Sequence, residues 1–476
     1  MTILNDTRLE SKRFFIWNFT GGGPSPDTGQ SWIERVASMD YPERVKAMLF
    51  NDIAEMAKAP WLFSKHPGRD FSRKRKLGFE GLLRFLVSME GGTTGHELLK
   101  YFDYDVRAPS NSAFCQQRGK LLVEAFQYLL LQFNSHFPFE RYKGKYRLVA
   151  CDGSEFNIPR NPDDPDTFHP PNGKSTRGFN MVHAIPLYDI LNKRYLDCVV
   201  QPGRKKNEFR AICDLADHYQ YGDVPIFIAD RGFSSYDFFA HAMEGGLFFL
   251  VRAKDVNARR LLNLETLPDN LDAGAEIILT RTQSKRKREH PELAERYRHV
   301  SKDVAFDYIE PGSTDEYPIS LRILRFEVAD GIYENIVTNL PADEFPADEV
   351  KELYRMRWDI ETSFRDLKHT IGATSFHSKK AEYIEQEIWA RLILFNFCAI
   401  IATHVAVEQK NTKHEYQVNF AMAMRICHHF VRLREDAPPP DVEGLIGSHM
   451  LPVRPGRTYA RQHRFQLPAS FCYRFS

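Results

Sequence analysis

Two short apolar runs that each end in an aspartate constrain the fold of this chain more than any other feature. YRLVACD covers residues 146–152, and VPIFIAD covers residues 224–230. The second run is almost wholly apolar, which is typical of a strand buried on both faces of a sheet. Active sites of α/β proteins form at the carboxyl ends of such strands. The sequence therefore predicts an α/β fold in which Asp152 and Asp230 lie at that edge of the sheet.

The neighbouring segments support this interpretation. Strand-like and helix-like patterns alternate after residue 146, in the order three strands, helix, strand, helix, strand. Besides the two runs above, the predicted strands are 180–190, 194–200 and 246–253, and the predicted helices are 207–219 and 235–244.

Five regions are predicted along the 476 residues. Residues 1–140 read as an N-terminal helical and DNA-binding domain, and residues 141–254 as the first part of the α/β core. Residues 255–345 form a β-rich insertion with strand-like segments at 276–282, 303–309, 319–328 and 333–339, separated by turns and a basic loop. Residues 346–436 hold the second part of the core and further helices. Residues 437–476 are a linker and a basic tail.

A third acidic residue, Glu361, lies in a helix predicted from residue 346 onward. At about 100° per residue, Tyr354, Arg357, Glu361 and Lys368 fall within roughly 60° of one another. Their polar stripe borders the apolar stripe of the helix, whereas an ordinary amphipathic helix turns its charges away from the core. The stripe therefore indicates a cleft at the edge of the core. The alternative is a solvated face on which Arg357 and Glu361, four residues apart, form an ion pair.

Three carboxylates from separate elements are a candidate metal site. Clustered carboxylates repel one another unless a cation neutralises them. Oxygen ligands without a thiolate suit Mg²⁺ or Mn²⁺, and two such ions about 3.5–4 Å apart catalyse phosphodiester cleavage in many enzymes. Taken alone, each of the two aspartates has a simpler interpretation. Asp152-Gly153 could be a turn, and Asp230 could cap a strand or form an ion pair.

Taken together, these residues resemble the insertion-sequence-four family of DDE transposases. The family signature Tyr-x2-Arg-x3-Glu-x6-Lys is matched by Tyr354, Arg357, Glu361 and Lys368. The words VACDGSEF, IADRGF and TNLP are also similar to the family, and the resemblance covers about residues 110–380. It implies a ribonuclease H-like catalytic core interrupted by a β-rich insertion, with an N-terminal helical domain and a helical C-terminal region.

The resemblance also implies a function. Asp152, Asp230 and Glu361 would be the catalytic triad that binds two Mg²⁺ or Mn²⁺ ions, and Tyr354, Arg357 and Lys368 would hold DNA. The activity would be cut-and-paste transposition, in which phosphodiester bonds at the transposon ends are hydrolysed and the 3′-hydroxyl is transferred into target DNA. The partners would be double-stranded DNA, both terminal inverted repeats and target, and a second copy of the chain when DNA is bound.

Two alternative functions stay open, of which the first uses the same triad and the second has no use for it. One is a structure-specific DNA nuclease, and the other is a transposase-derived DNA-binding regulator without strand transfer. The resemblance implies a prokaryotic cytoplasmic protein at the nucleoid with no membrane partner. The most apolar stretch, residues 392–407, is interrupted by Asn396 and His404 and reads as a buried helix, because a membrane span needs about 20 apolar residues.

Further DNA contacts are predicted outside the core. The net charge is only +1, but basic residues cluster, and such clusters suit a polyanion. Helices of the N-terminal region would present Ser112, Gln116, Gln117 and Arg118. Residues 451–476 contain five Arg and no acidic residue, and the DNA-binding candidates there are Arg454, Arg457 and Arg461.

The cysteines point to no further site. The seven Cys are scattered and none forms a C-x-x-C pair. The pattern therefore indicates neither a zinc site nor a disulfide framework.

Overall fold

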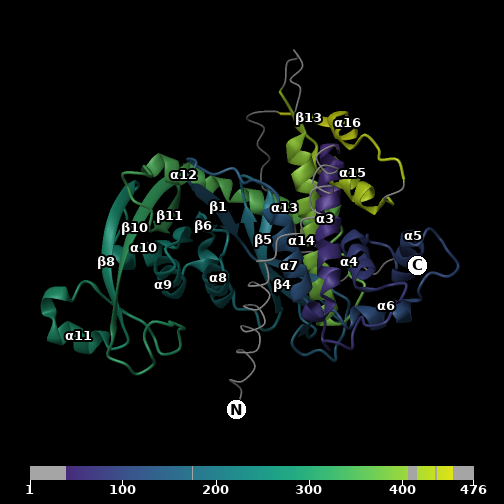
Figure 1. Cartoon of the computed structure of the whole chain (residues 1–476). Coiled ribbons are helices and arrows are strands. Elements are labelled where there is room, and N and C mark those ends of the chain that lie inside the picture. The colour runs from purple at the N-terminus through teal and green to yellow at the C-terminus, as the bar shows by residue number, and fades with distance from the viewer. Residues whose placement is uncertain (1–38, 174, 406–414, 435–436, 454–476) are drawn as a thin grey trace. The chain divides into compact units, whose positions relative to one another are not determined.

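A computed structural model of the chain describes residues 39–173, 175–405, 415–434 and 437–453 (Figure 1). These residues divide into two compact units. One contains residues 39–136 and 397–453, and the other contains residues 137–396. The region boundaries predicted above remain predictions.

The first unit is helical. Helix α6 (Asn111–Arg118) ends at its C-cap Gly119, before helix α7 (Glu124–Ser135) begins. Thr93 caps helix α5 (Thr94–Tyr101) by accepting a hydrogen bond from the His96 N–H. Its α-helices are α3 (Tyr41–Lys58), α4 (Phe79–Ser88), α5 (Thr94–Tyr101), α6 (Asn111–Arg118), α7 (Glu124–Ser135), α15 (Phe420–Arg432) and α16 (Val442–Gly447), and its strands β12 (Tyr416–Val418) and β13 (Met450–Pro452) pair.

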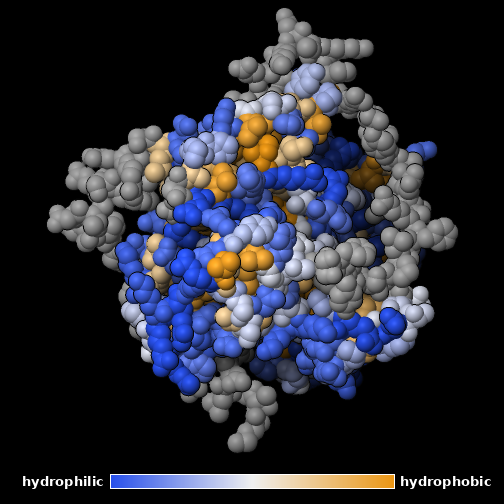
Figure 2. Space-filling view, turned by 90° about the vertical axis from the view of Figure 1, so that its right-hand side faces the viewer, coloured by the Kyte–Doolittle hydropathy of each residue, from blue (hydrophilic) through white to orange (hydrophobic). Residues whose placement is uncertain are grey.

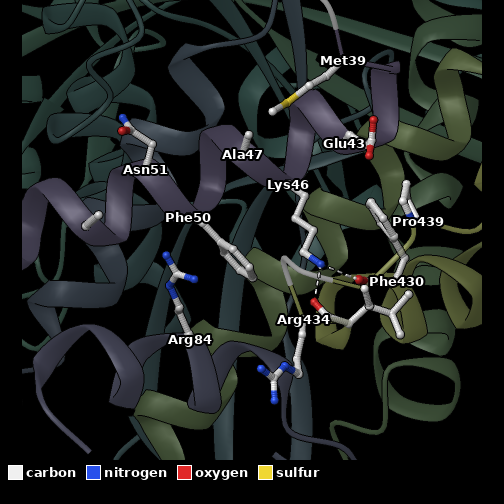
Figure 3. Close-up of a pocket in the computed structure, with 13 residues that line it drawn as sticks. Met39, Glu43, Lys46, Ala47, Phe50, Asn51, Arg84, Phe430, Arg434 and Pro439 are labelled. Atoms are coloured by element: carbon white, nitrogen blue, oxygen red, sulfur yellow. Dashed lines mark hydrogen bonds between the residues drawn. The ribbon is translucent and has the colours of Figure 1, made fainter. Parts of the chain in front are cut away.

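A pocket in this unit is lined by residues of α3, α4 and α15 (Figure 3). The ammonium group of Lys46 donates hydrogen bonds to the Phe430 and Leu433 carbonyls, at 3.1 Å and 2.5 Å. These carbonyls lie at the end of α15, where a helix lacks partners for its last C=O groups and favours a positive charge. Lys46 therefore has a structural role as a helix cap.

The second unit is built on a mixed sheet of eleven strands. The main strand order is β5-β4-β1-β6-β7-β11-β10-β8-β9, and β2 (Ser154–Ile158) and β3 (Phe168–His169) pair with β4. Strand β1 runs parallel to β6, and β6 runs parallel to β7. The bounds are β1 (Tyr146–Cys151), β4 (Phe179–Asp189), β5 (Arg194–Pro202), β6 (Val224–Ala229), β7 (Phe248–Ala253), β8 (Leu271–Thr280), β9 (Tyr297–His299), β10 (Glu316–Ala329) and β11 (Ile332–Thr338).

Helices α8 (Glu208–Asp217) and α9 (Tyr236–Glu244) pack side by side against this sheet (Figure 1). All six residues of β1 are buried. The core joins Val149 and Phe227 of the strands to Ile212 and Phe238 of the helices. The predicted α/β class is confirmed. The predicted strands and helices follow one another in the expected order, but the prediction missed the short strands β2 and β3 between β1 and β4.

Helix α14 (Ala381–His404) is long and apolar enough to cross a membrane by length and composition, but 89% of its most apolar window is buried. The Asn396 side chain explains why a polar residue is tolerated there, since it accepts from the Tyr195 N–H at 2.8 Å and donates to the Tyr195 C=O at 2.7 Å. The predicted buried helix is confirmed. On the face drawn in Figure 2, hydrophilic residues predominate and hydrophobic ones form separate patches.

The segment between β7 and β11 departs from the sequence pattern in two places. Residues 303–309 form turns and not the predicted strand, because Phe306 and Ile309 insert into the core and the Asp307 N–H donates to the Asp237 carboxylate at 2.9 Å. The basic run 285–288 lies on helix α11 (Gln283–Glu289) and not in a loop. Helix α10 (Asp255–Leu262) follows β7.

Candidate active site

The first two predicted carboxylates follow neighbouring parallel strands. Cys151 at the end of β1 pairs with Ala229 at the end of β6. The next residues, Asp152 and Asp230, therefore leave the sheet side by side at its carboxyl edge. Their side chains are 24% and 33% exposed, so both are accessible from solvent while resting on a buried core.

The third carboxylate comes from the helical segment after β11. This segment divides into α12 (Ala347–Met356), with Pro346 as its N-cap, and α13 (Trp358–Arg365). Arg357 lies at the junction in a helical conformation. Its guanidinium group approaches Glu361 Oε1 at 3.2 Å and Asp152 Oδ2 at 3.8 Å. Arg357 therefore links the carboxylate of the helix to the carboxylate of β1.

Two side chains of this segment are more buried than a solvated face allows. Arg357 is 4% exposed and Tyr354 is 3% exposed. The Tyr354 hydroxyl donates to Asp230 Oδ1 at 3.3 Å. The ion pair between Arg357 and Glu361 that the alternative predicted is present, but its solvated face is wrong for Arg357, because that side chain is buried against the carboxylates.

Lys368 lies in a π-helical turn, Asp366–Thr370. Because this turn departs from α-helical geometry, the helical wheel misplaces Lys368 relative to Arg357. The Lys368 ammonium donates to the Glu155 carbonyl on β2 at 2.8 Å and lies 4.8 Å from the centre of the Phe156 ring. Burial lowers the pKa of Lys368, opposed by the Glu155 carboxylate. The structure thus places Lys368 beside the strand that follows Asp152.

The electrostatics of the cluster show an excess of negative charge. Burial raises the pKa of Asp152 to about 6, and the Glu361 and Asp230 carboxylates add to this, against the opposing effects of Arg357 and the Gly153 N–H. The pKa of Arg357 is raised: burial lowers it, but Tyr354 and the three carboxylates outweigh that effect. A half-buried set of oxygen ligands with this imbalance fits a hard divalent cation.

The raised pKa of Asp152 predicts a pH-dependent stability. The unfolded carboxyl titrates near 3.8 and the folded one near 6, so the folded chain binds the extra proton between these values. The free energy of unfolding therefore falls as the pH rises between these two pKa values. Above the higher value, the folded chain bears the full cost of the ionised, buried Asp152. We expect Asp152→Asn to stabilise the metal-free chain at pH 8 by on the order of 1–3 kcal/mol, and to have little effect at pH 4.

Urea unfolding at pH 4 and pH 8, with a chelator present, measures the free energy of unfolding of the variant and the wild type. The matched control is Asp330→Asn, because Asp330 is exposed. An Asp152→Asn variant that is no more stable than the control at pH 8 would contradict the assigned electrostatics.

Four residues around the carboxylates were not predicted from the sequence. Arg252 of β7 lies 3.8 Å from Asp230 Oδ1 and 3.3 Å from Glu334 Oε1. His183 of β4 lies 2.9 Å from Glu208 Oε1 at the start of α8. The Asp-Gly pair after β1 is the sequence feature that indicates His183 and Glu208. A glycine is needed at position 153 because a Cβ there would lie 2.5 Å from His183 Nε2 and 3.1 Å from Glu208 Oε1.

Another predicted DNA contact, Arg118, belongs to the helical unit. Arg118 is 1% exposed, with its guanidinium 5.7 Å from the centre of the Phe114 ring. The prediction that α6 presents Arg118 on its surface is therefore wrong, because its aliphatic and planar groups are used in packing. Ser112 and Gln116 are exposed on the same helix. Arg454, Arg457 and Arg461 lie outside the described residues.

Comparison with known proteins identifies the family. The family model of the transposase DDE domain matches residues 143–397, more than half of the chain. The chain belongs to the DDE transposase family. The predicted resemblance to insertion-sequence-four transposases is thereby confirmed. The family generally uses divalent metal ions, in agreement with the oxygen ligands found here.

Individual relatives match over short stretches. The chain is 32% identical over 88 residues to the transposase InsG of insertion sequence element IS4 from Escherichia coli K12, which is 18% of this chain and 20% of the relative. It is 35% identical over 63 residues to the transposase of insertion sequence element IS231F from Bacillus thuringiensis subsp. israelensis, 13% of each chain. The aligned stretches thus span a fifth or less of these relatives.

One solved structure also aligns with the chain. A piggyBac transposase synaptic complex with hairpin DNA matches with a TM-score of 0.43 and 12% identity, over 86% of this chain and 85% of that one. A similarity at this level supports no argument about the site.

Proposed function

We propose that this chain is a cut-and-paste DNA transposase that hydrolyses phosphodiester bonds at the ends of its element and transfers the 3′-hydroxyl into target DNA. The observation that carries the proposal is the placement of Asp152 and Asp230 after two registered parallel strands, with Glu361 joined to them through Arg357. The family match supports the same conclusion.

The core is proposed to be ribonuclease H-like. In the order β5-β4-β1-β6-β7, β4 is antiparallel to both β5 and β1, and β6 and β7 run parallel to β1. Residues 255–345, which hold the elements from α10 to β11, would be the β-rich insertion, since they stand between the second Asp and the Glu in the chain.

Asp152, Asp230 and Glu361 would hold two Mg²⁺ or Mn²⁺ ions. When bound, such ions lower the pKa of the attacking water and stabilise the leaving oxygen. The chain's own residues prepare the site: Tyr354 orients Asp230 through a hydrogen bond, and Arg357 offsets the repulsion between Asp152 and Glu361. Because the Tyr354 ring is buried, we assign it this orienting role and not the stacking of a DNA base.

Arg357 and Lys368 are proposed to contact phosphates of the bound strand. Arg357 contacts two of the three carboxylates, and Lys368 lies against β2, the strand that follows Asp152. Charge-assisted contacts from such cations to phosphate position a strand for cleavage. If Glu361 and Asp152 hold cations, the guanidinium of Arg357 would no longer be needed to offset their charge and would be available to contact a phosphate.

Arg357→Ala is expected to lower single-turnover cleavage by one to two powers of ten at saturating DNA, because a charge-assisted contact contributes about 1.5–3 kcal/mol. The matched control is Arg355→Ala in the same helix. Arg355 is 54% exposed and pairs only with the exposed Glu352 among the described residues, so this change should leave cleavage near normal. Equal cleavage by the two variants would rule out the role of Arg357.

The proposed partners are the terminal inverted repeats of the element and the target DNA, with a second copy of the chain when ends are bound. The proposed location is the bacterial cytoplasm, at the nucleoid. Arg454, Arg457 and Arg461 would add sequence-independent phosphate contacts.

Excision tests this function. A plasmid carrying the inverted repeats found beside the coding region should release the intervening segment when the chain and Mg²⁺ are added. Binding to the repeats without cleavage in Mg²⁺ or Mn²⁺ would favour the DNA-binding regulator instead.

A further inference from the structure

A second cluster of candidate metal ligands lies within the unit of residues 137–396. Cys213 of α8 and Asp237 and His241 of α9 are all buried, and their potential ligand atoms lie within 4.8 Å of one another. Asp307, in the turns that replace the predicted strand, joins them with its Oδ2 3.4 Å from His241 Nε2. None of these four residues belongs to the carboxylate cluster described above.

The imidazole of His241 points into this cluster, and one of its two ring nitrogens makes no hydrogen bond with the described residues. Its side chain is 8% exposed, and Nε2 is a buried atom with no hydrogen-bond partner among the described residues. The nearest oxygens belong to Asp307 at 3.4 Å and Asp237 at 3.8 Å. A buried polar nitrogen in this state is costly unless something occupies the space it faces.

Three separations in this cluster are close to the edge length of a metal tetrahedron. Cys213 Sγ lies 3.8 Å from Asp237 Oδ2, and His241 Nε2 lies 3.4 Å from Asp307 Oδ2 and 3.8 Å from Asp237 Oδ1. Zinc bonds of about 2.0–2.3 Å in a tetrahedral site place neighbouring ligand atoms about 3.3–3.8 Å apart. The Cys213 thiol donates a weak hydrogen bond to Asp237 in the absence of an ion, whereas His241 Nε2 forms none with the described residues; all three separations are suitable for ligands around one ion.

Two of the candidate ligands are also oriented as metal ligands usually are. His241 Nδ1 lies 2.8 Å from Asp217 Oδ1, and a carboxylate on one ring nitrogen leaves the other free to bind a metal. The Asp307 N–H donates to Asp237 Oδ1, which leaves Oδ2 directed towards the thiol of Cys213. Asp307 is 44% exposed and gives an ion access from solvent.

We propose that Cys213, Asp237, His241 and Asp307 bind one zinc ion. A thiolate, an imidazole and carboxylates favour zinc over magnesium, and binding releases the thiol proton to solvent. The site would fasten the turns at 303–309 to α8 and α9, and it does not depend on the proposed catalytic function. The competing interpretation is an ion-pair network in which a protonated His241 and Arg210, 2.5 Å from Asp307 Oδ2, balance the carboxylates.

Metal analysis of the full chain distinguishes the two. After zinc loading and removal of loose metal, elemental analysis should find one zinc per chain, and cobalt in its place should give a thiolate-to-cobalt charge-transfer band. His241→Ala and Cys213→Ser should lose the zinc and the band. The matched controls His218→Ala and Cys198→Ser should keep both, and Asp152→Ala should keep both because it alters only the carboxylate cluster.

Asp307→Asn provides a variant with little effect on folding, since this side chain is the most exposed of the four. It should weaken zinc affinity at least tenfold while the melting temperature of the zinc-free chain stays unchanged. A wild-type chain that binds no zinc would overturn the proposal in favour of the ion-pair network. Zinc retained by both His241→Ala and Cys213→Ser, or a cobalt complex without the thiolate band, would overturn it equally.

Discussion

Replacing Asp230 by alanine is expected to lower the rate of cleavage at the element end by at least about a thousandfold. Asp230 leaves the sheet next to Asp152 and accepts the Tyr354 hydroxyl, so its loss removes one oxygen ligand and the anchor for Tyr354. Losing several kcal/mol of transition-state stabilisation has an effect of this size. DNA affinity should change by less than about twofold, because carboxylates do not attract phosphates.

Single-turnover cleavage and a binding titration on the same sample measure both quantities. The matched control is Asp330→Ala, an exposed aspartate in the turn between β10 and β11, which should behave like the wild type in both assays. An Asp230→Ala variant that cleaves within tenfold of the wild type in Mg²⁺ would remove Asp230 from the proposed triad.

Arg147→Ala is expected to destabilise the fold by about 3–5 kcal/mol, because removing one partner of a buried ion pair leaves its carboxylates unpaired. Arg147 is 2% exposed on β1. Its guanidinium lies 2.5 Å from Asp223 Oδ2 and 3.3 Å from Asp189 Oδ2, and both carboxylate side chains are 0% exposed. It also stacks 3.5 Å from the centre of the Phe139 ring.

Urea unfolding of the metal-free chain measures this change. Arg355→Ala serves as the control here as well, since an exposed ion pair contributes at most about 1 kcal/mol. If Arg147→Ala cost no more than Arg355→Ala, then the buried network around β1 would not contribute to stability as the contacts indicate.

The strands that carry Asp152 and Asp230 could be predicted because short, almost wholly apolar runs have few alternatives in a chain of this size. Their pairing could not, since register depends on contacts between residues 78 positions apart (Cys151 and Ala229). The segment 303–309 was predicted wrongly for the same reason. Its alternating pattern suits a strand, but the core of α8 and α9 and the Asp237 carboxylate draw it into turns.

The sequence pattern identified which residues form the candidate site, but it did not predict how their side chains are arranged. Tyr354, Arg357 and Glu361 were recognised by spacing, but the helical wheel assumed an unbroken α-helix and so could not place Lys368, which stands in a π-helical turn. Burial was also out of reach, because a charged side chain such as Arg357 or Arg118 gives no local signal that it lies inside. The scattered cysteines likewise gave no indication of the proposed zinc site, whose ligands meet only in the folded chain.

If this carboxylate cluster joins DNA strands as well as cutting them, it should transfer a pre-cleaved DNA end into a target. A labelled DNA end that already carries a free 3′-hydroxyl is mixed with supercoiled plasmid, the chain and Mg²⁺. We expect labelled plasmid with the wild type and none with Asp230→Ala. Cleavage of an intact end by the wild type without any joined product from the pre-cleaved end would rule out strand transfer and identify a nuclease.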